Sequence, residues 1–122
     1  MEKFVINGCR PLSGEINISG AKNAVLPILA ATVLNGGINV IHNCPDLKDV
    51  DVTVDILKHL GADVKREGST IIVDSSAMTN CEIPENLVCK LRASIFFMGP
   101  LLARFGEVTI SHPGDYVMLL LF

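Results

Sequence analysis

The sequence lacks any run of basic residues, and only 19% of its 122 residues are charged. Its formal net charge is −3, whereas a protein that binds the phosphate backbone of nucleic acids normally carries clustered Lys and Arg. No apolar stretch reaches the length of a membrane-spanning helix. Polar residues interrupt the first ten positions, so a cleaved secretory leader is not expected. We therefore expect no nucleic-acid partner and no membrane partner.

Metal-binding and redox motifs are also missing. The chain has four cysteines (Cys9, Cys44, Cys81 and Cys89) and three histidines (His42, His59 and His112). No two cysteines form a C-x-x-C pair and no histidines cluster, so neither a zinc site nor a redox pair is indicated. Scattered thiols of this kind are typical of a reducing cytoplasm, where we place the protein. We interpret the cysteines as small buried apolar residues and the histidines as structural or exposed.

What the sequence does have is a high apolar fraction, 49%, which is typical of a globular chain with a substantial core. Alternating patterns predict strands over 3–9, 15–18, 38–41 and 108–110, and a hairpin over 64–73 that turns at Gly68. Helical spacing predicts an amphipathic helix that starts near residue 46 and is ended by Gly61, and another from residue 84 to a stop at Gly106. The expected class is mixed α/β (α+β) in one domain.

The stretch 19–34 organises this interpretation. From Ala24 onward it is almost wholly apolar, which predicts a helix buried on all sides. Lys22 stands at the electropositive start of this helix, where a cation is mildly disfavoured and an anion is favoured. One explanation is an anion held jointly by backbone N–H groups and the Lys22 ammonium. The alternative is a lysine that simply extends into solvent.

An internal repeat places a second cation in an equivalent position. Arg92 follows Lys22 by 70 positions, and at the same offset Gly36 meets Gly106 and His42 meets His112. Each copy is thus a basic residue, an apolar helix, a glycine stop and an alternating strand. Two equivalent cations could face one anionic ligand. Alternatively, Arg92 forms a surface salt bridge with Glu85 or a neighbouring acid, which contributes little.

Three long motifs resemble the enolpyruvyl transferase family. They are L-S-G-E-I-N-I-S-G-A-K-N-A-V-L-P-I-L-A-A at 12–31, L-K-D-V-D-V-T at 47–53, and L-R-A-S-I-F-F-M-G-P-L-L-A-R-F-G-E-V at 91–108. The resemblance implies repeated βαβαββ units forming an inside-out α/β barrel, with the active site between two similar domains. Residues 1–122 would then be an incomplete N-terminal domain.

The resemblance also implies a reaction and its residues. The enolpyruvyl group of phosphoenolpyruvate would move to the 3-hydroxyl of UDP-N-acetylglucosamine with release of phosphate, and no metal or organic cofactor would be needed. Lys22 and Asn23 match the family's K-N pair, which binds phosphoenolpyruvate, and Arg92 matches the arginine that helps hold the substrates. Fixed cations suit this chemistry, because phosphate charge must be stabilised before and after transfer.

The sequence departs from the family after Gly114. The family has a cysteine there that acts as general acid, but by count Tyr116 occupies its position, with Asp115 one place earlier. An unperturbed phenol, with a pKa of about 10, is a poor acid for this step. The apolar run 117–122 is typical of a last core strand, or of what a shifted reading frame or an early truncation leaves behind. Catalysis by this chain as written is therefore not expected.

Two hypotheses follow. In the first, the chain is an enolpyruvyl transferase of cell-wall precursor synthesis, with Lys22, Asn23 and Arg92 binding the substrates. In the second, it is a non-catalytic remnant that at most binds anions or associates with an intact copy. Uncovered sheet edges and apolar faces of an incomplete domain would favour self-association.

Overall fold

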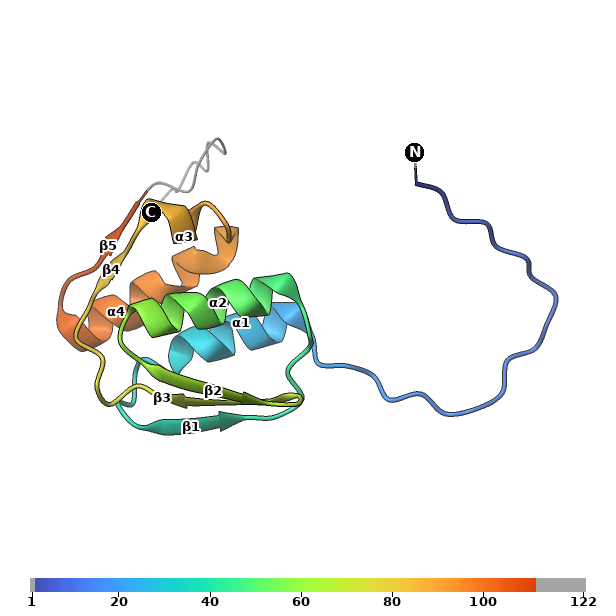
Figure 1. Cartoon of the computed structure of the whole chain (residues 1–122), viewed down its shortest axis with the longest axis horizontal. Coiled ribbons are helices and arrows are strands. Elements are labelled where there is room, and N and C mark those ends of the chain that lie inside the picture. Colours follow the sequence, from blue (N-terminus) through green and yellow to red (C-terminus); the bar gives the residue numbers. More distant parts are fainter. Residues whose placement is uncertain (1, 112–122) are drawn as a thin grey trace.

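Two helices cover one face of a three-stranded sheet in the first part of the chain (Figure 1). The structure is a computed structural model that describes residues 2–111. Helices α1 (Lys22–Ala31) and α2 (Lys48–His59) pack against each other. The sheet has the order β1-β3-β2 with both pairs antiparallel, and its strands are β1 (Ile38–Ile41), β2 (Asp63–Glu67) and β3 (Thr70–Asp74).

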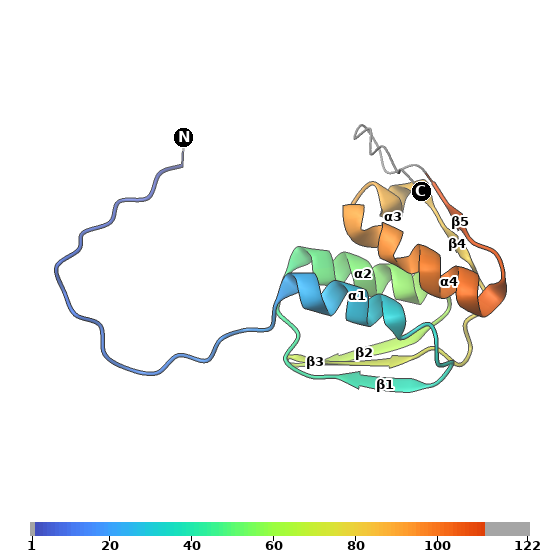
Figure 2. The same cartoon turned by 180° about the vertical axis from the view of Figure 1, so that it is seen from behind.

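The second part of the chain adds short helices and a two-stranded pair. The elements are β4 (Glu82–Ile83), α3 (Glu85–Val88), the 3-10 helix η1 (Arg92–Phe97), α4 (Met98–Phe105) and β5 (Thr109–Ile110). β4 and β5 pair in parallel, and η1 packs on α1. Seen from behind, α4 lies near the C-terminal end of α1 (Figure 2), where Arg104 donates a hydrogen bond of 2.9 Å to the carbonyl of Val33.

The amphipathic helix and the hairpin form where the sequence predicts them. α2 buries Val50, Val54 and Leu57 at helical spacing. It ends before Gly61, whose φ of +101° is accessible to glycine at little cost. β2 and β3 are joined at Gly68, which also has positive φ. The core lies between the sheet and the helices, and its fully buried members include Leu29, Val33, Ile56, Leu60, Ile71, Val73 and Phe97.

The predicted N-terminal strands over 3–9 and 15–18 are wrong for this structure. Residues 2–18 run away from the domain as an extended arm without secondary structure (Figure 1), and the chain meets the domain at Ser19 and Gly20. Their apolar side chains are exposed, among them Phe4 at 96% and Ile16 at 90%. An alternating pattern becomes a strand only when a neighbouring strand pairs with it. No other part of the described chain pairs with this arm.

Two helix predictions also need correction. α1 is not buried on all sides, because it buries Val25, Leu26 and Leu29 but leaves Ile28 47% exposed. The helix expected from residue 84 to Gly106 is broken into α3, η1 and α4. The first break follows Val88, the last residue of α3, and includes Leu91, which is extended with φ −144°. Proline lacks the N–H of a continuing helix but fits a first turn. Pro100, in the first turn of α4, therefore favours a new helix start after η1.

Three smaller outcomes complete the comparison. The strand β4 was not expected, because two residues before a proline give almost no pattern. The four cysteines are not uniformly buried: Cys44 is buried, Cys81 is intermediate, and Cys9 and Cys89 are exposed. None of the helices formed by residues 2–111 is long and apolar enough to cross a membrane.

Candidate functional site

The start of α1 and the segment leading into η1 line one hollow of about 510 Å³. Lys22 and Asn23 come from α1, and Arg92 is the first residue of η1. The structure thus brings the three sequence-predicted site residues to one place, although 70 positions separate Lys22 from Arg92. The remaining lining residues are Leu26, Asp49, Lys90, Leu91, Ala93, Ile95 and Phe96.

Lys22 is held at this hollow by an ion pair. Its Nζ lies 3.1 Å from Oδ2 of Asp49, which is in the first turn of α2. The two side chains are 47% and 35% exposed, so solvent screens the attraction and the pair contributes little to stability. The preceding residue, Ala21, is extended and offers no side-chain cap to α1. Lys22 therefore points toward another helix of the domain, which differs from a lysine that only extends into solvent.

Arg92 reaches the hollow because the chain turns at Leu91. The extended backbone of Leu91 directs its own side chain into the core, where it is 4% exposed, and starts η1 with Arg92 at the surface. η1 packs on α1, so Arg92 and Lys22 face the same space from two sides. Burial of Leu91 thus holds the neighbouring Arg92 in position at the edge of the hollow.

The hollow combines positive charge with apolar walls. Lys22, Lys90 and Arg92 supply three cations, and Asp49 is the single carboxylate among the residues that line it. Two of its apolar walls, Leu26 and Leu91, are almost fully buried. A small anion with an apolar portion suits such a surface, because cations bind its charged oxygens and the walls contact its carbon atoms.

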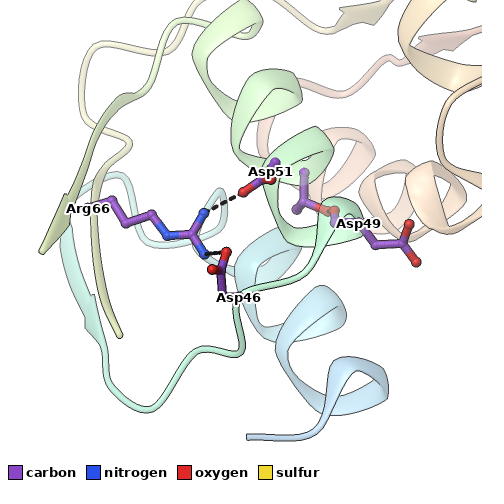
Figure 3. Close-up of polar contacts among 5 residues, drawn as sticks. Asp46, Asp49, Asp51 and Arg66 are labelled. Atoms are coloured by element: carbon purple, nitrogen blue, oxygen red, sulfur yellow. Dashed lines mark hydrogen bonds and ion pairs between the residues drawn. The ribbon is translucent and has the colours of Figure 1, made fainter. Parts of the chain in front are cut away.

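A second set of charges lies close by and joins β2 to the start of α2 and to the segment before it. Arg66 on β2 forms ion pairs with Asp51 and with Asp46, the latter at 3.6 Å (Figure 3). The side chain of Asp49 points away from Arg66 in the same view. Asp49 and Asp51, two residues apart on one helix, thus serve different cations.

Asp49 and Lys90 were not singled out by sequence reasoning. Asp49 is in the first turn of α2 and stands in one of the three family-like motifs, at 47–53. Its presence in that motif was the signal that could have identified it. Lys90 directly precedes the motif at 91–108 and gave no separate signal.

Another hollow, of about 470 Å³, lies beside the turn between β2 and β3 and includes Cys44. Burial raises the pKa of the Cys44 thiol, and its Sγ lies 3.5 Å from the carbonyl oxygen of Ile41. A thiol with a raised pKa is a weaker nucleophile at neutral pH. Cys44 also lines a different hollow from Lys22, Asn23 and Arg92, so it is not placed to act as the family's acid cysteine does. Tyr116, Asp115 and His112 lie outside the described residues.

Comparison with known proteins is informative at this point. The sequence pattern of the family described as EPSP synthase (3-phosphoshikimate 1-carboxyvinyltransferase) matches residues 6–119. UDP-N-acetylglucosamine 1-carboxyvinyltransferase 2 of Caldanaerobacter subterraneus subsp. tengcongensis is 54% identical over 114 residues, 93% of this chain and 27% of that protein. UDP-N-acetylglucosamine 1-carboxyvinyltransferase of Desulfatibacillum aliphaticivorans is 46% identical over the same shares.

A solved structure agrees with these sequence matches. The crystal structure of the enolpyruvyl transferase NikO from Streptomyces tendae superposes with a TM-score of 0.74 at 31% identity, and the match covers 85% of this chain and 24% of that one. The chain spans about a quarter of the length of the curated relatives that it matches. The resemblance in sequence thus extends to the fold of the described residues.

Proposed function

Because the chain belongs to the enolpyruvyl transferase family described as EPSP synthase, we propose that it supplies the phosphoenolpyruvate-binding part of a carboxyvinyltransferase. In the complete reaction the enolpyruvyl group would move to the 3-hydroxyl of UDP-N-acetylglucosamine and phosphate would leave. This is the first committed step of peptidoglycan synthesis, in the cytoplasm. The names of the two relatives support this choice of sugar nucleotide.

One observation carries the proposal: Lys22, Asn23 and Arg92 line a single hollow. Phosphoenolpyruvate carries a phosphate and a carboxylate, so two cations that line one hollow can each bind one charged end. The Asn23 amide can donate a further hydrogen bond, and the apolar walls accommodate the enol carbons. Fixed cations also stabilise the phosphate as it leaves, which is the part of the chemistry that these residues can perform.

Binding of phosphoenolpyruvate to the full 122-residue chain tests the proposal. We expect saturable shifts of backbone amide resonances at the start of α1 and in η1 on titration at low ionic strength. Lys22→Ala and Arg92→Ala should each weaken binding by about tenfold, in line with the loss of one charge-assisted hydrogen bond. Lys65→Ala is the matched control, since Lys65 lies on the sheet and lines a different hollow. Equal loss in all three variants would indicate nonspecific charge attraction and would reject the site.

Turnover is a separate question, and we expect none from this chain alone. Tyr116 replaces the cysteine that acts as general acid in the family. Phosphate release from phosphoenolpyruvate and UDP-N-acetylglucosamine should stay at the level of a blank. Release that disappears in Lys22→Ala would show instead that the chain is an active enzyme.

The exposed arm favours a second candidate function, association with another copy of the chain or with an intact relative. Its large apolar side chains are 75% to 98% exposed: Phe4, Val5, Ile6, Leu12, Ile16 and Ile18. Six such side chains on one extended segment have a strong tendency to be covered by a partner. Sedimentation velocity should show dimers or larger species, and the change of Phe4, Ile6 and Ile16 to Ser should restore the monomer. A wild-type chain that sediments as a monomer at all concentrations would rule this candidate out.

A further inference from the structure

Asp49 has an unusual position, because it is the one carboxylate among the described residues that line a hollow with three cations. It belongs to α2, whereas the three cations come from the start of α1 and the segment entering η1. Its Oδ2 is 3.1 Å from Nζ of Lys22. That is the distance at which a phosphate or carboxylate oxygen of a ligand would contact the same ammonium.

We propose that Asp49 is the internal counter-ion of this hollow: it holds the Lys22 ammonium while the hollow is empty and competes with a bound anion for it. The inference rests on the proposed function, since it concerns the same site. It assigns to Asp49 a role opposite to that of a substrate-binding residue. The carboxylate weakens anion binding and thereby sets how strongly the hollow attracts small anions.

Two effects of Asp49 oppose each other, and their sizes decide the sign. By fixing Lys22, the carboxylate reduces the entropy that the ligand must remove from that side chain. By its charge, it repels every anionic oxygen that enters. The first effect is small, because a pair that is 47% and 35% exposed is screened and holds the lysine only loosely. The second effect acts on each charge of a ligand such as phosphoenolpyruvate, so repulsion dominates.

Asp49→Asn tests this sign directly. The amide has nearly the same shape and can still accept a hydrogen bond from Lys22, but it carries no charge. Titration of phosphoenolpyruvate into the full chain at low ionic strength should give tighter binding by about two- to fivefold, the range expected of a partly screened pair. The gain should shrink as salt is added. Loss of a contact that only shapes the hollow would weaken binding, so tighter binding that fades with salt distinguishes the charge of Asp49 from a structural role.

Asp51→Asn is the matched control. Asp51 is also in the first turn of α2 and also ion-paired, but with Arg66 on the sheet and not with Lys22 (Figure 3). It should leave the affinity for phosphoenolpyruvate within about twofold of the wild type, because its charge is paired elsewhere. Circular dichroism on each variant shows whether the fold is retained, and Asp49→Ser serves as a second neutral variant.

Each outcome decides the matter. Tighter binding by Asp49→Asn with no change in Asp51→Asn supports the counter-ion role. If the wild type binds and Asp49→Asn binds equally or more weakly, the inference fails while the proposed function stands. Equal gains in affinity in both variants would show that the gain comes from net charge alone, and this result would also overturn the inference. Binding by neither the wild type nor Asp49→Asn would overturn the inference and the proposed function together.

Discussion

The two copies of the repeat agree in some features and differ in others. Lys22 and Arg92 both start a helical segment and both line the hollow. Gly36 and Gly106 both have positive φ, +60° and +76°, but only Gly106 caps its helix directly, whereas α1 is already capped at Thr32. In the first copy, however, α1 is one helix and its strand β1 pairs antiparallel with β3. The second copy has a broken helix, η1 and α4, and its strand β5 pairs in parallel with β4.

The shared features are the cation at the start of the helical segment and the glycine with positive φ after it. The differing features are those that depend on neighbours in the fold. The residue types at these positions are therefore repeated in both copies, whereas helix continuity and strand pairing depend on the neighbouring elements of each copy. Substitutions at equivalent positions of the two copies show which effects on stability the copies share and which depend on the neighbouring elements.

The largest expected contrast is between Gly20 and its equivalent, Lys90. A Cβ on Gly20 would lie 2.0 Å from the backbone carbonyl oxygen of Asn43, so the backbone itself must shift. We expect Gly20→Ala to lower the free energy of unfolding by about 3 kcal/mol. Lys90→Ala, at an exposed position of the second copy, should change it by less than about 0.5 kcal/mol. Urea denaturation measures both free energies of unfolding. Comparable losses in the two variants would show that the close approach of Gly20 to Asn43 does not set the cost of the substitution.

The two equivalent glycines with positive φ should instead respond alike. Gly36→Ala and Gly106→Ala each place a side chain on a residue with positive φ, which costs about 1 kcal/mol. At Gly36 the new Cβ would lie at ordinary contact distance, 3.5 Å, from Nη2 of Arg104, and at Gly106 it would meet nothing within 4 Å. Thermal unfolding of the two variants should therefore show similar decreases in Tm. A decrease confined to one glycine would mean that only one copy needs the left-handed conformation.

The smallest effect is expected at Ser94, whose equivalent in the first copy is Ala24. The Ser94 hydroxyl is buried, with the residue 1% exposed, and it has no hydrogen-bond partner within residues 2–111. A buried hydroxyl without a partner is destabilising. Ser94→Ala should therefore leave the free energy of unfolding unchanged or raise it by up to about 1 kcal/mol. Destabilisation by this change, measured by urea denaturation, would reveal a partner for the hydroxyl in solution.

Sequence reasoning predicted the elements whose periodicity is long and clear. α2, with Val50, Val54 and Leu57 on one face, and the hairpin that turns at Gly68 are confirmed. The assignment to the enolpyruvyl transferase fold is also confirmed. The arm over residues 2–18 could not be predicted, because alternation does not reveal whether a pairing strand is present. The break at Leu91 depends on tertiary packing of η1 against α1, which local pattern does not encode.

The site was predicted only in part, again because local sequence pattern does not encode contacts between elements. The 70-residue offset between Lys22 and Arg92 suggested a shared ligand, and both residues line one hollow; their binding roles remain a prediction. The ion pair of Lys22 with Asp49 joins α1 and α2, and helix spacing within one element cannot reveal a pairing between two elements. Tyr116 and Asp115 lie outside the described residues, so the expectation at the acid position stays untested.

The separation of Lys22 and Arg92 along the chain has a thermodynamic consequence. The hollow exists only when η1 is docked on α1, so an unfolded chain has no equivalent site. Any small anion that binds there shifts the folding equilibrium by mass action, with a stabilisation that grows with the logarithm of its concentration. The melting temperature of the chain in the presence of a candidate metabolite therefore reports occupancy without requiring any chemical turnover.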